Sequence, residues 1–232
     1  MEALSQSLQP YKELVGSVAS YVTIAQFFSG AFVCKDIYKK GSTQGCSPMP
    51  FIGGVTIAIL MLKYGLLVND SAMITVNVAA IFLNSIYSLF FYKYAADKYE
   101  EVLKPVAYGV ATLAVFLGYA QLENPENLEY RFGLVLTLLM LALIGAPLLD
   151  VKNMIANQDA SSIPLPITLM GAIVTFLWLI YGIILLNVFM IIQNCIGFIL
   201  CIVQLGLLFK YPGRISSSGG QSKKTEPAKK EQ

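Results

Sequence analysis

The sequence predicts an all-α membrane protein with seven transmembrane helices, arranged as two parallel three-helix bundles joined by a linker helix (3+1+3). Three observations predict this fold class. Of the 232 residues, 56% are apolar and only 13% are charged, against roughly 25% charged residues in soluble domains. Apolar runs of about 20 residues, long enough to cross a bilayer as a helix, recur along the whole chain. The third observation is an internal repeat.

The repeat joins residues 48–94 to a second copy near the C-terminus, at a shift of 117 positions. Apolar matches carry little weight in so apolar a chain, whereas polar matches carry more. The polar matches place Tyr64-Gly65, Asn77 and Lys93-Tyr94 on Tyr181-Gly182, Asn194 and Lys210-Tyr211. A repeat of this length indicates one folding unit that is used twice.

The apolar runs divide the chain into seven expected spans. Three spans form a first bundle within 14–94, a linker helix and its loops occupy 95–131, and three spans form a second bundle within 132–211. A three-span unit ends on the side opposite its start, and the single linker span restores that side, so both bundles enter the membrane in the same direction. The spans are expected at 14–34, 48–68, 72–92, 105–121, 132–150, 164–185 and 188–209.

The distribution of Lys and Arg predicts the orientation of the chain. Most of the 16 basic residues fall in 35–47, 93–104, 151–163 and 212–232, all on one side of a seven-span protein. Cytoplasmic loops carry such an excess. The polar, irregular residues 1–13 are therefore expected outside the cell, and the disordered tail 212–232 in the cytosol. The expected location is the plasma membrane, with a Golgi or endosomal membrane as the alternative.

Two further features concern the loops and the interior of the spans. Asn69-Asp70-Ser71 forms a glycosylation sequon in a short turn on the outer side. No Asp or Glu lies in the middle of a predicted span, and the chain has no His. Ion-coupled carriers place ionisable groups at depth, so the expected substrate is uncharged and moves down its own gradient. We expect no metal site, no cofactor, no enzyme activity and no nucleic-acid partner.

Asn77 and Asn194 are the most deeply placed strongly polar pair. Each lies about five residues inside its span, roughly 7–8 Å below the outer end at 1.5 Å per residue. Facing each other across a pseudo-twofold axis, two carboxamides suit the hydroxyl groups of a sugar; the alternative is that each bonds a neighbouring helix. Trp178, the only Trp, is either an interfacial anchor or an aromatic wall for a sugar ring. Met61 corresponds to Trp178 in the first copy.

Proline and glycine predict hinges near the cytosolic face. Pro147 cannot donate a backbone hydrogen bond and permits a kink in its span, and Gly30 stands at the corresponding position of the first copy. Pro50, Pro164 and Pro166 lie at the cytosolic starts of two spans, where proline is also common in the first helical turn. Together these five residues are expected to form an inner gate.

Residues 14–211 resemble the SWEET family of sugar transporters. The small size of the chain and its single tail are similar to the animal members. The resemblance rests on the order of short motifs in both copies. These motifs are Lys39-Lys40-Gly41-Ser42-Thr43 before Ser47-Pro48-Met49-Pro50-Phe51, Tyr64-Gly65 before Asn77, and then Pro147-Leu148, Pro164, Trp178, Tyr181-Gly182 and Asn194.

The resemblance implies roles for residues of the substrate site and the outer gate. Asn77 and Asn194 correspond to the family's sugar-binding Asn pair, and Trp178 corresponds to its pocket Trp. Met61 stands where the family has a first-half Trp, so the substrate preference of plant members does not carry over. The outer-gate Tyr and its Asp partner correspond to Tyr64 and Asn187.

The resemblance also implies an inner gate built on four positions. Pro50, Pro147 and Pro164 correspond to three of the family's four gate prolines, and Pro166 competes with Pro164 for its place. Gly30 stands at the position of the fourth proline, which is a departure from the family pattern.

The expected function is facilitative uniport of a sugar across the membrane by alternating access between the bundles. Two alternatives stay open at this point. A PQ-loop carrier of amino acids or other small solutes has the same helix plan, although this chain contains no Pro-Gln dipeptide. A seven-span receptor shares the outside N-terminus but not the repeat. The partners expected are a small-molecule sugar and the lipid bilayer, and the sequence leaves a homo-oligomer open.

Overall fold

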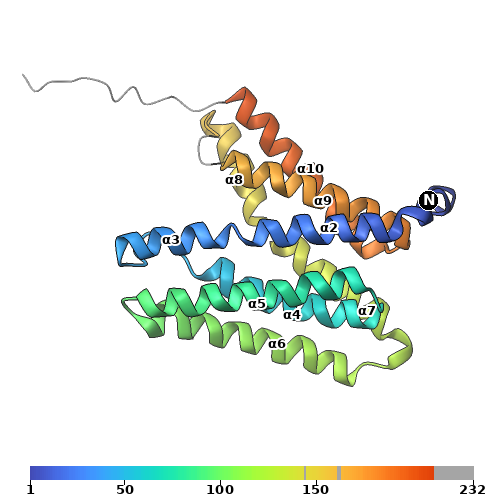
Figure 1. Cartoon of the computed structure of the whole chain (residues 1–232), viewed down its shortest axis with the longest axis horizontal. Helices are drawn as coiled ribbons and strands as arrows, with labels where there is room; N and C mark the ends of the chain where they lie inside the picture. The colour runs from blue at the N-terminus through green and yellow to red at the C-terminus, as the bar shows by residue number, and fades with distance from the viewer. Residues whose placement is uncertain (144, 161–162, 212–232) are drawn as a thin grey trace, which may run out of the picture.

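The structure, a computed structural model, describes residues 1–143, 145–160 and 163–211, without the side chains of residues 145–147 (Figure 1). All regular secondary structure in these ranges is helical. The elements in chain order are α1 (Glu2–Leu8), the 3-10 turn η1 (Gln9–Tyr11), α2 (Lys12–Phe27), α3 (Gly30–Lys40), α4 (Met49–Leu67), α5 (Ser71–Tyr94), the π-helical turn η2 (Tyr99–Leu103), α6 (Lys104–Leu122), α7 (Pro125–Leu143), α8 (Gly145–Asn157), α9 (Leu165–Leu185) and α10 (Val188–Lys210).

Seven segments of the described chain are long and apolar enough to cross a membrane, which agrees with the predicted fold class. Two of them are composite: α1 to α3 form the first span, and α7 with α8 form the fifth. The spans are Glu2–Lys40, Met49–Leu67, Ser71–Tyr94, Tyr99–Leu122, Pro125–Asn157, Leu165–Leu185 and Val188–Lys210.

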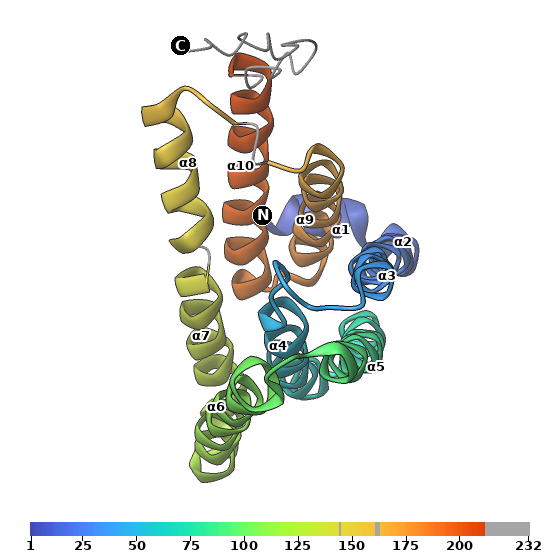
Figure 2. The ribbon, with the colours of Figure 1, turned by 90° about the vertical axis from the view of Figure 1, so that its left-hand side faces the viewer.

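The two bundles have the same internal order of helices. In the first bundle α5 lies between α2/α3 and α4, and in the second α10 lies between α7/α8 and α9 (Figure 2). The contacts between the bundles follow the same symmetry: the first span of each bundle packs against the second span of the other, α2 against α9 and α7 against α4. The linker helix α6 lies outside this arrangement and packs against α4. The result is a pseudo-twofold molecule with the two bundles side by side.

The bundles join their second and third spans by tight turns of the same construction. Asn69 and Leu186 both have a left-handed backbone, with φ of 51° and 54°. The next residue then caps the following helix: Asp70 accepts a hydrogen bond from the Met73 N–H at 2.8 Å, and Asn187 caps α10 through Met190. Such caps stabilise a helix by about 0.5–2 kcal/mol. We call this end of the molecule, residues 68–70 and 186–187, the turn end.

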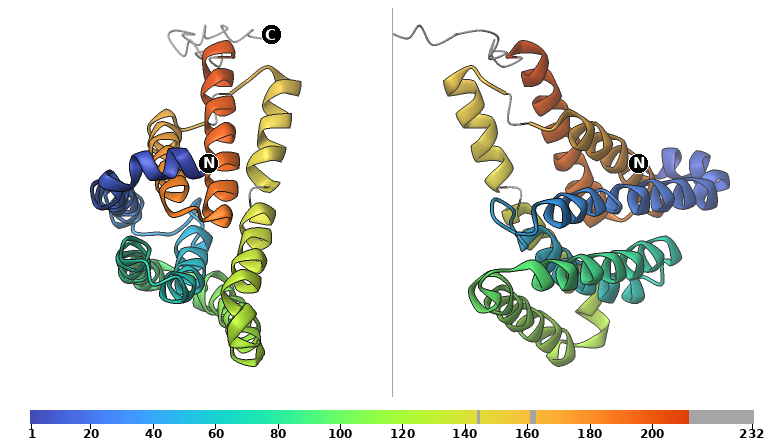
Figure 3. Two further views of the ribbon diagram at one scale, coloured as in Figure 1. Left: turned by 90° about the vertical axis from the view of Figure 1, so that its right-hand side faces the viewer. Right: turned by 60° about the vertical axis from the view of Figure 1, so that its left-hand side comes forward.

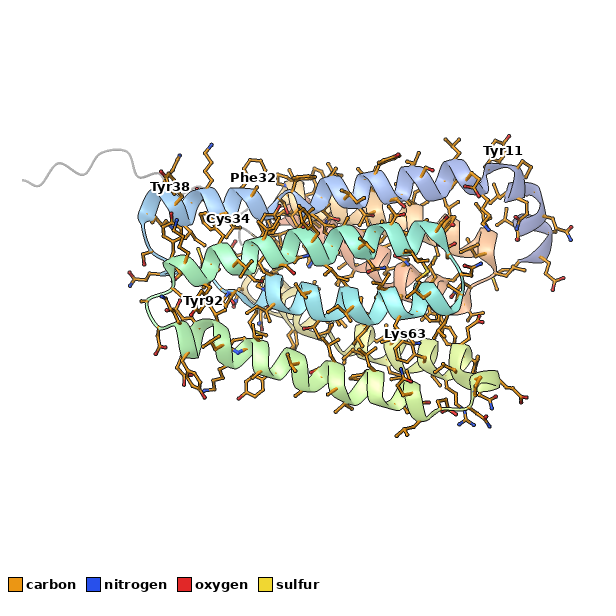
Figure 4. All side chains as sticks on the ribbon, turned by 60° about the horizontal axis from the view of Figure 1, so that its bottom comes forward. Tyr11, Phe32, Cys34, Tyr38, Lys63 and Tyr92 are labelled. Carbon is orange, nitrogen blue, oxygen red and sulfur yellow. The ribbon has the colours of Figure 1, made fainter. Side chains whose placement is uncertain are left out.

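We call the opposite end, where α3, α5, α8 and α10 finish, the basic end. Tyr38 and Tyr92 lie toward it, whereas Tyr11 and Lys63 lie toward the turn end (Figure 4). The ribbons of α8 and of the second half of α10 diverge from α3 and α5 toward the basic end (Figures 1 and 3). The bundles are therefore held more closely together at the turn end.

The first span of the first bundle is interrupted. Phe28 and Ser29 separate α2 from α3, and their N–H groups bond the carbonyls of Ala25 and Gln26, three residues earlier, at 3.2 and 3.0 Å. Tightened turns of this kind inside a helix often mark a hinge. In the second bundle α7 and α8 lie along one candidate span, Pro125–Asn157. The interruption between α2 and α3 lies beside Gly30, the residue predicted to loosen the first span.

Of the two residues predicted to loosen the first spans, Gly30 lies beside this interruption. Gly30 is the first residue of α3 and is buried, and a Cβ atom there would lie 2.5 Å from the Tyr87 ring. The absence of a side chain at Gly30 therefore allows α3 to approach α5. Pro147 lies in α8, and its side chain lies outside the described residues.

The N-terminal segment differs from the irregular structure predicted for residues 1–13. It forms α1 and η1, which fold back on the turn end of α9. Ser5 Oγ and Gln9 Nε2 both donate to the backbone carbonyl of Ile184, each at 2.8 Å. The last four carbonyls of a helix have no partner within that helix, so α1 supplies a partner that the end of α9 lacks.

The expected polar loop 122–131 also differs, since only Glu123 and Asn124 separate α6 from α7. Pro125 begins α7, a position at which its missing N–H costs nothing. The Glu123 carboxylate accepts from the Tyr119 hydroxyl at 2.6 Å and from Arg131 Nη1 at 3.1 Å. The hydrogen bond from Tyr119, followed by those from the Asn124 backbone and Arg131, lowers the pKa of Glu123 below its ordinary value.

The docking of the linker helix provides a test of the fold. A Cβ atom on Gly109 would lie 2.6 Å from Thr56 Oγ1 on the neighbouring α4, whereas one on Gly118 of the same helix would meet nothing within 4 Å. We expect Gly109→Ala to force α6 away from α4 and to destabilise the protein by about 1–3 kcal/mol. Gly118→Ala is the matched control and should be neutral or stabilising by about 0.5–1 kcal/mol. Thermal unfolding in detergent measures both, and equal melting temperatures would contradict the packing described.

Candidate functional site

A cavity of about 410 Å³ lies between the two bundles, within the range of roughly 300–1,000 Å³ typical of small-molecule sites. Helices α2, α4, α5, α7, α9 and α10 all contribute to its wall. The structure thus brings together the four residues predicted to bind substrate, Asn77, Asn194, Trp178 and Met61. The lining residues are Thr23, Ile57, Met61, Tyr64, Met73, Val76, Asn77, Met140, Thr175, Trp178, Met190, Gln193, Asn194 and Gly197.

The two asparagines have the same environment in the two bundles. Asn77 Nδ2 donates to the carbonyl of Met73, and Asn194 Nδ2 donates to the carbonyl of Met190, both at 2.8 Å. Each bond lies within one helix and uses a single N–H. The carbonyl oxygen and the second N–H of each amide therefore remain for a ligand in the cavity. The alternative role, in which each amide bonds a neighbouring helix, is not what these contacts show.

Trp178 is held in place inside the protein. Its side chain is 9% exposed, and Nε1 donates to Thr23 Oγ1 on α2 at 2.9 Å. The Thr23 hydroxyl in turn donates to the carbonyl of Ala19 at 2.6 Å, so its direction is fixed. Trp178 is thus part of the cavity wall and of the contact between bundles, rather than an anchor at the membrane surface.

Methionines occupy the repeat positions that correspond to Trp178 and Thr23. The shift of 117 positions takes Met61 to Trp178 and Thr23 to Met140, and all four residues line the cavity. One wall is consequently a rigid aromatic group fixed by a hydroxyl, and the opposite wall is a pair of flexible thioethers. The sequence predicted an asymmetric pocket from Met61 and Trp178, and the structure adds a second pair of repeat counterparts with different side chains, Thr23 and Met140.

Two hydrogen bonds between the bundles close the turn end. Asn187 Nδ2 donates to the Tyr64 hydroxyl at 2.9 Å, which brings together the predicted outer-gate pair. The Tyr181 hydroxyl donates to Asp70 Oδ2 at 2.7 Å. The second pair is the repeat counterpart of the first, because Tyr181 corresponds to Tyr64 and Asp70 to Asn187. The sequence analysis did not predict the pair Tyr181–Asp70, although applying the repeat shift to Tyr64 and Asn187 leads to these two residues.

Each gate tyrosine packs on a glycine of the facing bundle. A Cβ atom on Gly133 would lie 2.6 Å from the Phe189 ring and 3.0 Å from the Tyr64 ring, and one on Gly16 would lie 2.8 Å from the Tyr181 ring. Gly16 and Gly133 are again repeat counterparts. The turn end therefore contains the same arrangement twice. In each copy a tyrosine ring packs against a glycine of the other bundle, and its hydroxyl forms a hydrogen bond with the side chain that caps a helix.

A second hollow lies beyond the gate at the turn end. Its volume is about 780 Å³, and Tyr64, Asp70, Glu126, Glu129 and Asn187 are among its lining residues. Tyr64 lines both this hollow and the inner cavity. The tyrosine thus stands between a vestibule and the cavity that holds the asparagine pair.

The described residues of the predicted inner gate differ in exposure. Pro50, Pro164 and Pro166 are exposed, and Gly30 is buried against Tyr87.

The chain matches the protein family described as "Sugar efflux transporter for intercellular exchange" (MtN3/saliva) over residues 13–99 and 130–215, once in each bundle. The protein belongs to the SWEET family. It is 32% identical over 211 residues to sugar transporter SWEET1 of Drosophila pseudoobscura pseudoobscura, which covers 90% of this chain and 93% of that protein. It is 31% identical over 207 residues to sugar transporter SWEET1 of Caenorhabditis elegans, covering 89% and 68%.

The fold is also that of the SWEET family. A solved eukaryotic SWEET transporter superposes with a TM-score of 0.78 at 21% identity, covering 88% of this chain and 98% of that one. The family match omits residues 100–129, which contain the linker helix α6. The predicted plan of two repeated bundles and an unrepeated linker is confirmed, and membership of the SWEET family decides against a seven-span receptor and a PQ-loop carrier.

The two hydrogen bonds of the gate can be removed one at a time. Tyr181→Phe deletes the donor to a carboxylate, a bond of about 1.5–3 kcal/mol, and Tyr64→Phe deletes a neutral acceptor, a bond of about 0.5–1.5 kcal/mol. We expect both to favour opening of the turn end, by about tenfold or more for Tyr181→Phe and less for Tyr64→Phe.

The single tryptophan reports this opening. In vesicles of one orientation, a membrane-impermeant quencher added at the turn end should quench Trp178 fluorescence faster in both variants than in the original protein. Tyr130→Phe is the control, because Tyr130 lines the vestibule and is 66% exposed. Identical quenching rates in all four proteins would show that these bonds do not close the gate.

Proposed function

We propose that this protein is a facilitative sugar transporter that works by alternating access between its two bundles. The observation that carries the proposal is the cavity in which Asn77 and Asn194, from matched positions of the two bundles, line the same space as Trp178. Carboxamides offer both donors and acceptors to adjacent hydroxyl groups, and an aromatic face suits the apolar face of a sugar ring. The names of the relatives, sugar transporters in both insect and nematode, support this substrate class.

In the transport cycle the turn end and the basic end are closed alternately. Opening the turn end breaks the bonds Tyr64–Asn187 and Tyr181–Asp70, and the bundles then close at the basic end. The interruption between α2 and α3 supplies bending in the first bundle, and Pro147 permits a kink in the second. Gly30 and Pro147, with Pro50, Pro164 and Pro166, form the inner gate.

Transport is driven by the sugar gradient alone. The described lining of the cavity contains no Asp, Glu, Lys or Arg, so no charge there can bind and release a coupling proton or cation. Asp70 is a buried acid at the turn end, and both of its carboxylate oxygens already accept hydrogen bonds, one from the Met73 N–H in the cap of α5 and one from the Tyr181 hydroxyl.

The chain is a multi-pass membrane protein, and the proposed membrane is the plasma membrane with the turn end outside. Lys39 and Lys40 end α3, Lys93 lies in the last turn of α5, and Lys210 ends α10. These groups gather basic charge at one end of the spans, the side that faces the cytosol in membrane proteins.

Substitution of the asparagines tests the binding site. Asn77→Ala and Asn194→Ala each remove a donor and an acceptor from the cavity, so we expect sugar uptake to fall by about tenfold or more. Asn84→Ala is the matched control, because Asn84 Nδ2 makes the same bond to its own helix, at 2.9 Å to the Ala80 carbonyl, yet lies outside the cavity lining. Uptake of radiolabelled glucose, fructose, sucrose and trehalose into proteoliposomes measures the effect. Wild-type uptake in both cavity variants would refute the site.

A gradient experiment tests the uniport mechanism. Because the described lining of the cavity holds no Asp, Glu, His, Lys or Arg, an imposed pH or Na⁺ gradient should leave the initial rate of uptake unchanged in the same proteoliposomes. Exchange of labelled sugar against unlabelled sugar inside provides the positive control. Accumulation of sugar above its external concentration under either gradient would contradict uniport and leave the sugar site in place.

A further inference from the structure

Gln193 is a third carboxamide in the cavity, next to Asn194 on α10. Its Nε2 donates to Thr137 Oγ1 on α7 at 2.7 Å. Thr137 is 4% exposed, and its hydroxyl donates to the carbonyl of Gly133 at 2.8 Å. The hydroxyl hydrogen is thus committed to Gly133, and Thr137 can only accept from Gln193.

This chain of bonds restrains the side chain of Gln193. An amide is planar, so holding one N–H at Thr137 limits the directions open to the carbonyl oxygen and to the other N–H. A polar group held in this way is already ordered before a ligand arrives, and binding to it loses less side-chain entropy. Gln193 therefore has the character of a recognition group in the cavity wall.

The first bundle has no counterpart to this amide. The repeat places Val76 at the position of Gln193, and Val76 also lines the cavity. Hydrogen-bonding capacity is therefore unequal on the two sides of the pseudo-axis. The second bundle offers two adjacent carboxamides, Gln193 and Asn194, while the first offers Asn77 beside an apolar side chain.

We propose that Gln193 is a sugar-binding residue that determines which hydroxyl pattern the transporter accepts. The inference rests on the proposed sugar transport and deepens it. A site built to hydrogen-bond a hydroxyl strongly rejects an analogue that lacks it, because its own polar group is then left unpaired, whereas an apolar wall discriminates weakly. Gln193 reads one hydroxyl that Val76 cannot read, and the sugar consequently has one preferred orientation between the bundles.

A positional role is the competing explanation for Gln193. The bond to Thr137 also ties α10 to α7, and its loss would disturb the cavity for every sugar alike. The two roles differ in selectivity: loss of a tie lowers all affinities by one factor, whereas loss of a reading group changes the ratio between a sugar and one particular deoxy analogue.

The experiment measures binding of D-glucose and its 2-, 3-, 4- and 6-deoxy analogues to the purified full-length protein. Trp178, the only Trp, lines the same cavity and reports binding through its fluorescence. Gln193→Val installs the side chain of the repeat counterpart, and Gln193→Met keeps the length and the helix propensity should the valine variant fail to fold. Gln204→Val, the same change on α10 at a residue outside the cavity lining, is the matched control.

We expect the original protein and Gln204→Val to bind one deoxy analogue about tenfold or more weakly than glucose. In Gln193→Val and Gln193→Met this ratio should fall toward one, with the ratios for the other analogues unchanged. A uniform loss of affinity, or ratios identical to those of the original protein, would overturn the inference and leave sugar transport standing. An original protein that neither binds nor transports any of these hexoses would refute the proposed function for hexoses, and this inference with it.

Discussion

The conformation depends on two hydrogen bonds that tie the bundles together at the turn end, and their construction explains how they can break without damage. Asp70 uses Oδ1 to cap α5 and Oδ2 to accept from Tyr181. Asn187 uses its carbonyl oxygen to cap α10 and its amide nitrogen to donate to Tyr64. Because each side chain divides the two tasks between different atoms, the opening proposed for the turn end leaves both helix caps in place. The bundles can thus separate as rigid units.

Pseudo-symmetry governs the scaffold and is broken where a ligand is held. Helix order, caps, gate and the asparagine pair all recur across the axis, since alternating access needs two bundles that exchange equivalent positions. Trp178, Thr23 and Gln193 instead face Met61, Met140 and Val76 at their repeat positions. A hexose is chiral and has no twofold axis, so a strictly symmetric pocket could not be complementary to it. We expect the asymmetric positions to carry specificity and the symmetric positions to carry motion.

Much of this plan could be predicted from the sequence because spans and repeats depend on local composition. The paired asparagines followed from matched positions of the repeat, and the pair Tyr64–Asn187 followed from the resemblance to the SWEET family. What the sequence did not reveal depends on contacts between distant segments. α1 carries no strong helix signal and is ordered against the carbonyl of Ile184, 179 residues from Ser5. The bond from Gln193 to Thr137 exists only once α10 lies beside α7.

Substrate and gate meet through the aromatic residues. Tyr181 packs edge-on against Trp178, with ring centroids 5.7 Å apart, so a sugar stacked on Trp178 touches a neighbour of the gate. A ligand shifts a conformational equilibrium only by its difference in affinity for the two states, and a uniporter that held sugar much more tightly in one state would be trapped there. In the proposed mechanism Asn77 and Asn194 avoid this trap, because each is bonded to its own helix and would move with its own bundle. The proposed binding groups would then stay formed while the bundles exchange open ends, and the difference between the states would fall on the bonds at the turn end.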